Sequence, residues 1–116
     1  MATTYKVMTR ASVDHTGADT IYTVPSSTTA LIMSLNICNR DSSAKEVDVK
    51  LVSDTAQGNP NTNATVFLLK DFEIGAGSSL EVLAGQKIVM QTTDSLTIQA
   101  AGNDEIDVAL SVMELT

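Results

Sequence analysis

Residues 29–39 read TALIMSLNICN, an apolar stretch that contains neither proline nor glycine. Every second position from residue 31 onward holds a large aliphatic side chain: Leu31, Met33, Leu35 and Ile37. Because side chains two apart in a strand share a face, this spacing predicts a long β-strand with these four residues in a core. The other face is only partly polar, with Ile32, Ser34, Asn36 and Cys38. We therefore predict that this face meets another surface, with Ile32, Ser34 and Asn36 as interface residues.

The same alternation recurs along the chain. Residues 45–53 alternate valine and leucine with charged side chains, and residues 65–70 are expected to be their hairpin partner. Glycine-, serine-, asparagine- and proline-containing turns separate the apolar segments. The predicted strands are residues 3–9, 20–24, 29–39, 45–53, 65–70, 80–83, 87–91, 96–100 and 105–115. About eight or nine short strands with turns every 8 to 12 residues, and no substantial helix, predict an all-β antiparallel sandwich with jelly-roll-like order.

The length of 116 residues predicts a single domain over residues 1–116. Residues 1–19 precede the most regular strands and are interpreted as an N-terminal arm or edge strand, which could add to a neighbour's sheet. Within residues 3–9, Tyr5 and Val7 share one face, and we add both to the predicted interface. The longest loop is expected at residues 54–64, which read DTAQGNPNTNA.

Aromatic residues make up 3% of the chain and tryptophan is absent, so the core must be largely aliphatic. Only four aromatic side chains are present, and Phe67 is expected in the core. This scarcity disfavours a sugar-binding surface built by ring stacking, for which Tyr5 and Tyr22 are the remaining candidates.

The formal net charge of −7 argues against nucleic acids and anionic membranes as partners, because both select lysine and arginine. It leaves open a soluble, self-repelling protein or one whose acidic face meets a basic partner. Cys38 is the single cysteine, so no intramolecular disulfide can form, and a buried, inert thiol is expected. The N-terminus MATTYKVMTR lacks the apolar segment of a signal peptide, and no apolar run approaches the roughly 20 residues of a membrane span. These features predict synthesis in the cytoplasm.

Candidate catalytic chemistry is sparse. His15, the one histidine, follows Asp14 in a predicted turn, and no G-x-S-x-G nucleophile motif is present. One histidine and one cysteine cannot supply the usual ligands of zinc. The Gly75-Ala76-Gly77 stretch lacks the following helix of a dinucleotide-binding loop and is interpreted as a strand connection. We therefore predict no enzyme activity, no catalytic residues and no cofactor.

Acidic turns raise the question of calcium. The densest group comprises Asn103, Asp104, Glu105 and Asp107. Calcium needs six to eight oxygen ligands, and the D-x-D-x-D-G pattern of a calcium loop is absent. The favoured interpretation is that these carboxylates end strands and keep the sheet edges soluble, so no metal ligand is predicted.

Two long segments resemble small structural proteins of tailed bacteriophages, particularly those that infect marine bacteria and cyanobacteria. The first comprises TTYKVMTR and IYTVPSSTTALIMSLNICNRDSS, and the second is LLKDFEIGAGSSLEVLAGQKIVMQTTDSLTIQAAGNDEIDVALSVMELT. The resemblance implies a non-enzymatic β-sandwich protein of the virion, made in the host cytoplasm. Capsid decoration (cement) is the first expected role, with copies of itself and the major capsid protein as partners. A neck, tail or fibre-associated module, which binds a receptor or glycan, is the alternative.

Overall fold

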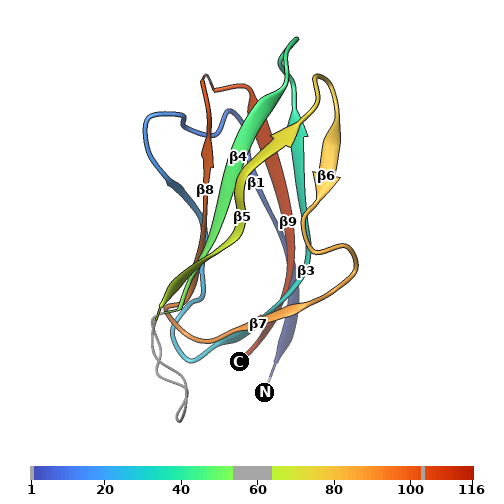
Figure 1. The fold of residues 1–116 in the computed structure, drawn as a ribbon. Helices are drawn as coiled ribbons and strands as arrows, with labels where there is room; N and C mark the ends of the chain where they lie inside the picture. Colours follow the sequence, from blue (N-terminus) through green and yellow to red (C-terminus); the bar gives the residue numbers. More distant parts are fainter. Residues whose placement is uncertain (1, 54–63, 103) are drawn as a thin grey trace.

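The structure is a computed structural model that describes residues 2–53, 64–102 and 104–116. Within these residues it contains nine β-strands and no helix, so the prediction of an all-β antiparallel sandwich is confirmed (Figure 1). Its strands are β1 (Thr3–Arg10), β2 (Asp19–Thr23), β3 (Thr29–Asn39), β4 (Lys45–Val52), β5 (Thr65–Ile74), β6 (Ser79–Glu81), β7 (Ile88–Met90), β8 (Ser95–Ala100) and β9 (Ile106–Leu115). The loop expected at residues 54–64 lies, apart from Ala64, outside the described residues.

Two antiparallel sheets face each other. The first has the order β1-β9-β3-β6, and β7 also pairs with β3. The second has the order β2-β8-β4-β5, in which β4 and β5 form the expected hairpin. In the part of the chain that the structure describes, no helix is long and apolar enough to cross a membrane.

The core between the sheets is almost entirely aliphatic, as the composition predicts. Strand β9 contributes every second residue, and β4 contributes Val47 and Val49. Tyr22, on β2, is the aromatic side chain that joins this core within the described residues. The largest fully buried side chains are Ile32, Leu35, Ile37, Met90, Leu96, Ile98, Ile106, Leu110, Val13, Val24, Val47 and Val49.

Strand β3 corrects the predicted assignment of its two faces. Leu35 and Ile37 are buried as expected, but Ile32 is also fully buried, whereas Leu31 is half-buried and Met33 is 38% exposed. The cause is a β-bulge. Along β9, Ile32 pairs with Val112 and Ser34 with Ser111, so Met33 is an extra residue on β3. An extra residue shifts the alternation by one, and Ile32 therefore cannot be an interface residue of the folded protein.

Strand β3 ends at a buried amide. The Asn39 side chain donates hydrogen bonds to the carbonyl oxygens of Ser43, at 2.9 Å, and Ile74, at 3.0 Å, while its own oxygen accepts from the Asp41 N–H. These bonds join the β3–β4 turn to the end of β5, which extends to Ile74 rather than stopping at residue 70. The end of the sandwich where these turns meet lies opposite the end that holds the chain termini (Figure 1).

Candidate functional site

The outer face of the first sheet carries a row of apolar side chains across four strands. Tyr5 on β1 pairs with Met113 on β9, Met113 pairs with Leu31 on β3, and Leu31 pairs with Val89 on β7. Directly paired residues project to the same side of a sheet, so these four side chains adjoin one another. Tyr5 is 69% exposed and Val89 is 60% exposed, while Leu31 and Met113 are half-buried. We call these four residues the apolar row.

Uncharged residues flank the apolar row on both sides. Toward the chain termini, Thr3, Leu115 and Thr29 form the neighbouring row of paired residues. On the other side come the paired residues Val7, Ser111 and Ser34, followed by Thr9, Ala109 and Asn36. Carboxylates border these rows at Glu81, which pairs with Asn36, and at Asp107, which pairs with Cys38. A chain of net charge −7 thus presents one broad uncharged surface, which we call the outer face.

The outer face contains four of the five residues predicted as an interface. Tyr5 and Val7 are strongly exposed, Asn36 is exposed and Ser34 is half-buried. Beside Asn36 lies a depression of about 260 Å³, lined in part by Ala109 and by Cys38, which is half-buried rather than buried as expected. Whether these four residues contact a partner stays a prediction.

A second exposed apolar group lies on β5, the edge strand of the other sheet. Val66, Phe67 and Phe72 are each more than two-fifths exposed, so the prediction that Phe67 belongs to the core is wrong. The ammonium groups of Lys50 and Lys70 each lie 5.1 Å from the centre of the Phe67 ring. Such cation–π contacts stabilise an exposed ring. Two of the protein's own lysines therefore lie close to the Phe67 ring, which remains 47% exposed.

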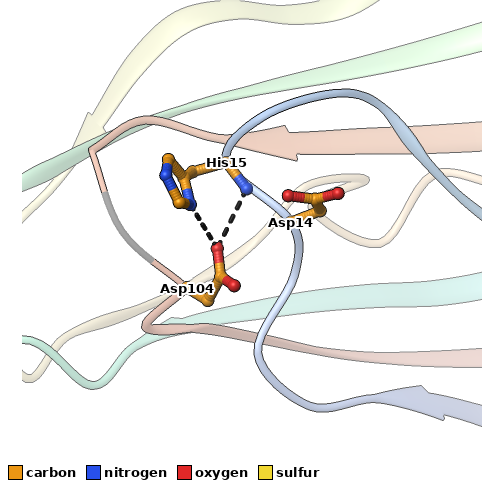
Figure 2. Close-up of side chains that lie close together, drawn as sticks. All are labelled: Asp14, His15 and Asp104. Atoms are coloured by element: carbon orange, nitrogen blue, oxygen red, sulfur yellow. Dashed lines mark hydrogen bonds and ion pairs between the residues drawn. The ribbon is translucent and has the colours of Figure 1, made fainter.

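In the turn that follows β1, the ring of His15 bonds an exposed carboxylate. The Nδ1 atom of His15 lies 2.5 Å from Oδ1 of Asp104, and the backbone N–H of His15 donates to the same oxygen (Figure 2). Asp14 points to the other side of the backbone, where its carboxylate accepts hydrogen bonds from the N–H and hydroxyl of Thr16. These hydrogen bonds, with the backbone one first, lower the pKa of Asp14. The ring of His15 thus bonds a carboxylate and has no nucleophile as its partner in the described residues.

Asp14, His15 and Asp104 bring three potential metal ligand atoms within 4.8 Å of one another. Two of the three side chains are exposed, and each carboxylate already accepts hydrogen bonds from the protein. The neighbouring carboxylates of the predicted acidic group have a structural partner, because the Arg40 guanidinium lies 2.9 Å from both Glu105 and Asp107. Asn103, also in that group, lies outside the described residues. The Gly75–Gly77 stretch forms the expected turn between β5 and β6, closed by a hydrogen bond from Ser78 N–H to Gly75 O.

A buried polar group between the sheets was not predicted from the sequence. Glu114 on β9 lies in phase with the core residues of that strand and is almost fully buried. Its carboxylate lies 2.8 Å from the Lys6 ammonium and accepts a hydrogen bond of 2.5 Å from the Tyr22 hydroxyl. The contact with Lys6, followed by that with Tyr22, lowers the pKa of Glu114, whereas burial first and then Glu114 raise the pKa of Tyr22. Tyr22 is thus a core residue and unavailable for stacking on a sugar.

Comparison with known proteins supports the fold and no particular activity. No family model and no curated protein sequence matches the chain. Among solved structures, a chain from Bacillus endospore appendages, described as disulfide-linked pili, superposes with a TM-score of 0.51 and 16% identity, over 99% of this chain and 87% of its own. A chain of the infectious bursal disease virus T13 particle superposes with a TM-score of 0.53 and 11% identity, over 97% of this chain. This chain spans only 30% of the viral one. At these identities the likeness shows a shared β-sandwich fold.

Proposed function

We propose that this protein is a non-enzymatic structural subunit of a bacteriophage virion, and specifically a capsid decoration protein that attaches through its outer face. The observation that carries the proposal is the apolar row, in which Tyr5 and Val89 are strongly exposed within an uncharged surface. Large exposed apolar patches mark contact surfaces because burying them in an interface is favourable. The partners would be the major capsid protein and further copies of this chain.

Three further observations support a structural role. The sequence resembles small virion proteins of tailed bacteriophages along most of its length. Its fold is shared with a chain of a virus particle and with a chain of a bacterial appendage. In the described residues the ring of the single histidine bonds the carboxylate of Asp104 and not a nucleophile. A protein of this kind acts by adding contact area to an assembly, for which surface shape and polarity matter more than reactive groups.

The proposal can be tested by reconstituting particles that lack the protein. Purified wild-type protein should co-sediment with such particles, and density for a β-sandwich should appear on the capsid lattice in a reconstruction. Val89→Glu should abolish co-sedimentation, because it places a charge within the apolar row. Val66→Glu is the matched control, since Val66 is also an exposed strand valine but lies on β5 of the other sheet. Density at the neck, tail or fibre would replace decoration by the alternative role. Absence of the protein from particles would refute both.

A further inference from the structure

Strand β1 has one bonded edge and one open edge. Its eight residues pair with β9 without a register shift, from Thr3 opposite Leu115 to Arg10 opposite Val108. On its other side, no strand of the described residues pairs with it, because β1 ends the strand order of the first sheet. The open edge therefore presents backbone groups that can bond another strand.

The hydrogen-bond pattern shows which residues offer these groups. The N–H of Ala2 donates to Thr116 O, and the N–H of Thr116 donates back to Ala2 O. In an antiparallel ladder the residues that face the partner strand alternate. The even-numbered residues of β1 therefore bond β9, and the odd-numbered residues direct their N–H and C=O groups to the open edge. These residues are Thr3, Tyr5, Val7 and Thr9.

The other sheet edges of the described residues are short or irregular, and β1 is neither. Strands β6 and β7 have three residues each. The β2 strand has five residues and a register shift in its pairing with β8. Strand β5 is long, but its pairing with β4 shifts register twice, and Asp71 adopts a φ of 50°. Short strands and bulges protect an edge, and β1 is a long edge of the described residues that has neither.

Electrostatics favours a second copy as the occupant of this edge. Strand β1 has two cationic residues and no acidic one, within a chain of net charge −7. Each cation is paired inside its own molecule, Lys6 with Glu114 at 2.8 Å and Arg10 with Asp19 at 3.1 Å. The edge is therefore locally neutral, and two copies can approach there without the repulsion expected between their acidic surfaces.

We propose that β1 pairs antiparallel with β1 of a second copy, so that the first sheets of two molecules join across a two-fold axis. Such a contact is isologous and closes as a dimer. It goes beyond the proposed role in the virion, because purified protein would form it without any particle.

The residues of β1 also select the register. Several registers place odd-numbered residues opposite each other, and the three centred nearest the middle of residues 2–10 have their axis at Tyr5, Lys6 or Val7. Centring on Lys6 places two ammonium groups directly opposite, which is unfavourable. Centring on Val7 is also unfavourable. It brings the partner strand alongside Arg10, where the salt bridge to Asp19 ties β1 to the start of β2. Centring on Tyr5 places Tyr5 opposite its own copy and Val7 opposite Thr3, with the aromatic pair at the axis.

The first test removes one backbone donor from the open edge. Val7→Pro deletes an N–H that points away from β9 and leaves the β1–β9 ladder intact. Sedimentation equilibrium should show a dimer for the wild type and a monomer for Val7→Pro, with unchanged circular dichroism. Val7→Thr is the matched control, because it keeps the N–H and the β-branched shape, and it should remain dimeric. A monomeric wild type at all concentrations, or a dimeric Val7→Pro protein, would overturn the proposal.

The second test does not depend on proline being tolerated. Across an antiparallel hydrogen-bonded pair the Cα atoms lie about 5.5 Å apart, within the range that a disulfide spans. In a Cys38→Ser background, Tyr5→Cys should therefore form a covalent dimer on mild oxidation, and Val7→Cys should not. Equal cross-linking at both positions, or at neither, contradicts this register. Val89→Glu separates the two proposals, because it should lose particle binding and keep the dimer.

Discussion

Replacing Tyr22 by phenylalanine should destabilise the fold by removing one hydroxyl. Phenylalanine fills the same space in the core, so the aliphatic packing around the ring is retained. The hydroxyl donates a 2.5 Å hydrogen bond to the buried, ionised carboxylate of Glu114. Hydrogen bonds to charged groups contribute about 1.5–3 kcal/mol, and a carboxylate that loses a partner while buried cannot recover it from water. The salt bridge to Lys6 remains, which keeps the expected loss near the middle of that range, about 2 kcal/mol.

The loss can be measured by urea unfolding followed by far-ultraviolet circular dichroism. In thermal unfolding of a domain of this size, the same loss of about 2 kcal/mol corresponds to a fall in Tm of roughly 6–12 °C. Tyr5→Phe is the matched control, because the same hydroxyl is removed from a residue that is 69% exposed, and it should change the unfolding free energy by less than about 0.5 kcal/mol. Equal stability of the Tyr22→Phe and wild-type proteins would show that the buried hydrogen bond makes no net contribution, and the reasoning would fail.

Two more predictions concern β3 and the pH dependence of stability. Ile32→Asp should leave the protein unfolded, because it buries an unpaired carboxylate at a fully enclosed position. Leu31→Asp changes a half-buried residue of the outer face and should fold, and circular dichroism with a thermal melt distinguishes the two variants. A folded Ile32→Asp protein would contradict the assigned bulge. The pKa of Glu114 in the folded protein is held below its ordinary value of 4.5, so its contribution to stability is present above about pH 4.5 and is lost as the pH falls through the lowered pKa. Urea midpoints measured between pH 7 and pH 3 should therefore fall less for Glu114→Gln than for the wild type. The control Glu73→Gln, at an exposed position, should follow the wild type. Parallel curves for Glu114→Gln and wild type would count against a stabilising role for ionised Glu114.

The strand pattern was readable from the sequence because most strands keep a strict alternation. In β9 the residues from Ile106 to Val112 alternate without interruption, and the apolar residues Ile106, Val108, Leu110 and Val112 are all buried. In β3 the alternation of large side chains is genuine, but it continues through a bulge that changes which face is inward. A bulge depends on the partner strand, and the sequence of β3 alone contains no signal that marks Met33 as the extra residue. The misassignment of Ile32 follows directly from this.

The candidate site was only partly predictable for a related reason. Tyr5 and Val7 could be placed on one face of β1 because they lie two residues apart, and both are strongly exposed. Glu114 lies two residues after Val112 and therefore on the inward face of β9, so its burial could have been expected from the sequence. Its partners could not, because Tyr22 and Lys6 come from strands far away in sequence. Phe67 was misplaced because an aromatic ring was assumed to need a core, whereas the two lysines that flank it provide an alternative environment.

The hydrogen bonds between Ala2 and Thr116 have a consequence for attaching other proteins to this one. They hold the two ends of the described chain side by side at one pole, while the turns that follow β1, β3, β5 and β8 gather at the opposite pole (Figure 1). A cargo protein fused at either end would therefore leave the sandwich from the same pole. A circular permutation is also possible: a short linker would join Thr116 to Ala2, and new termini would be placed in a turn at the other pole. A fused protein would then be attached at the far end of the molecule, with both sheets unchanged.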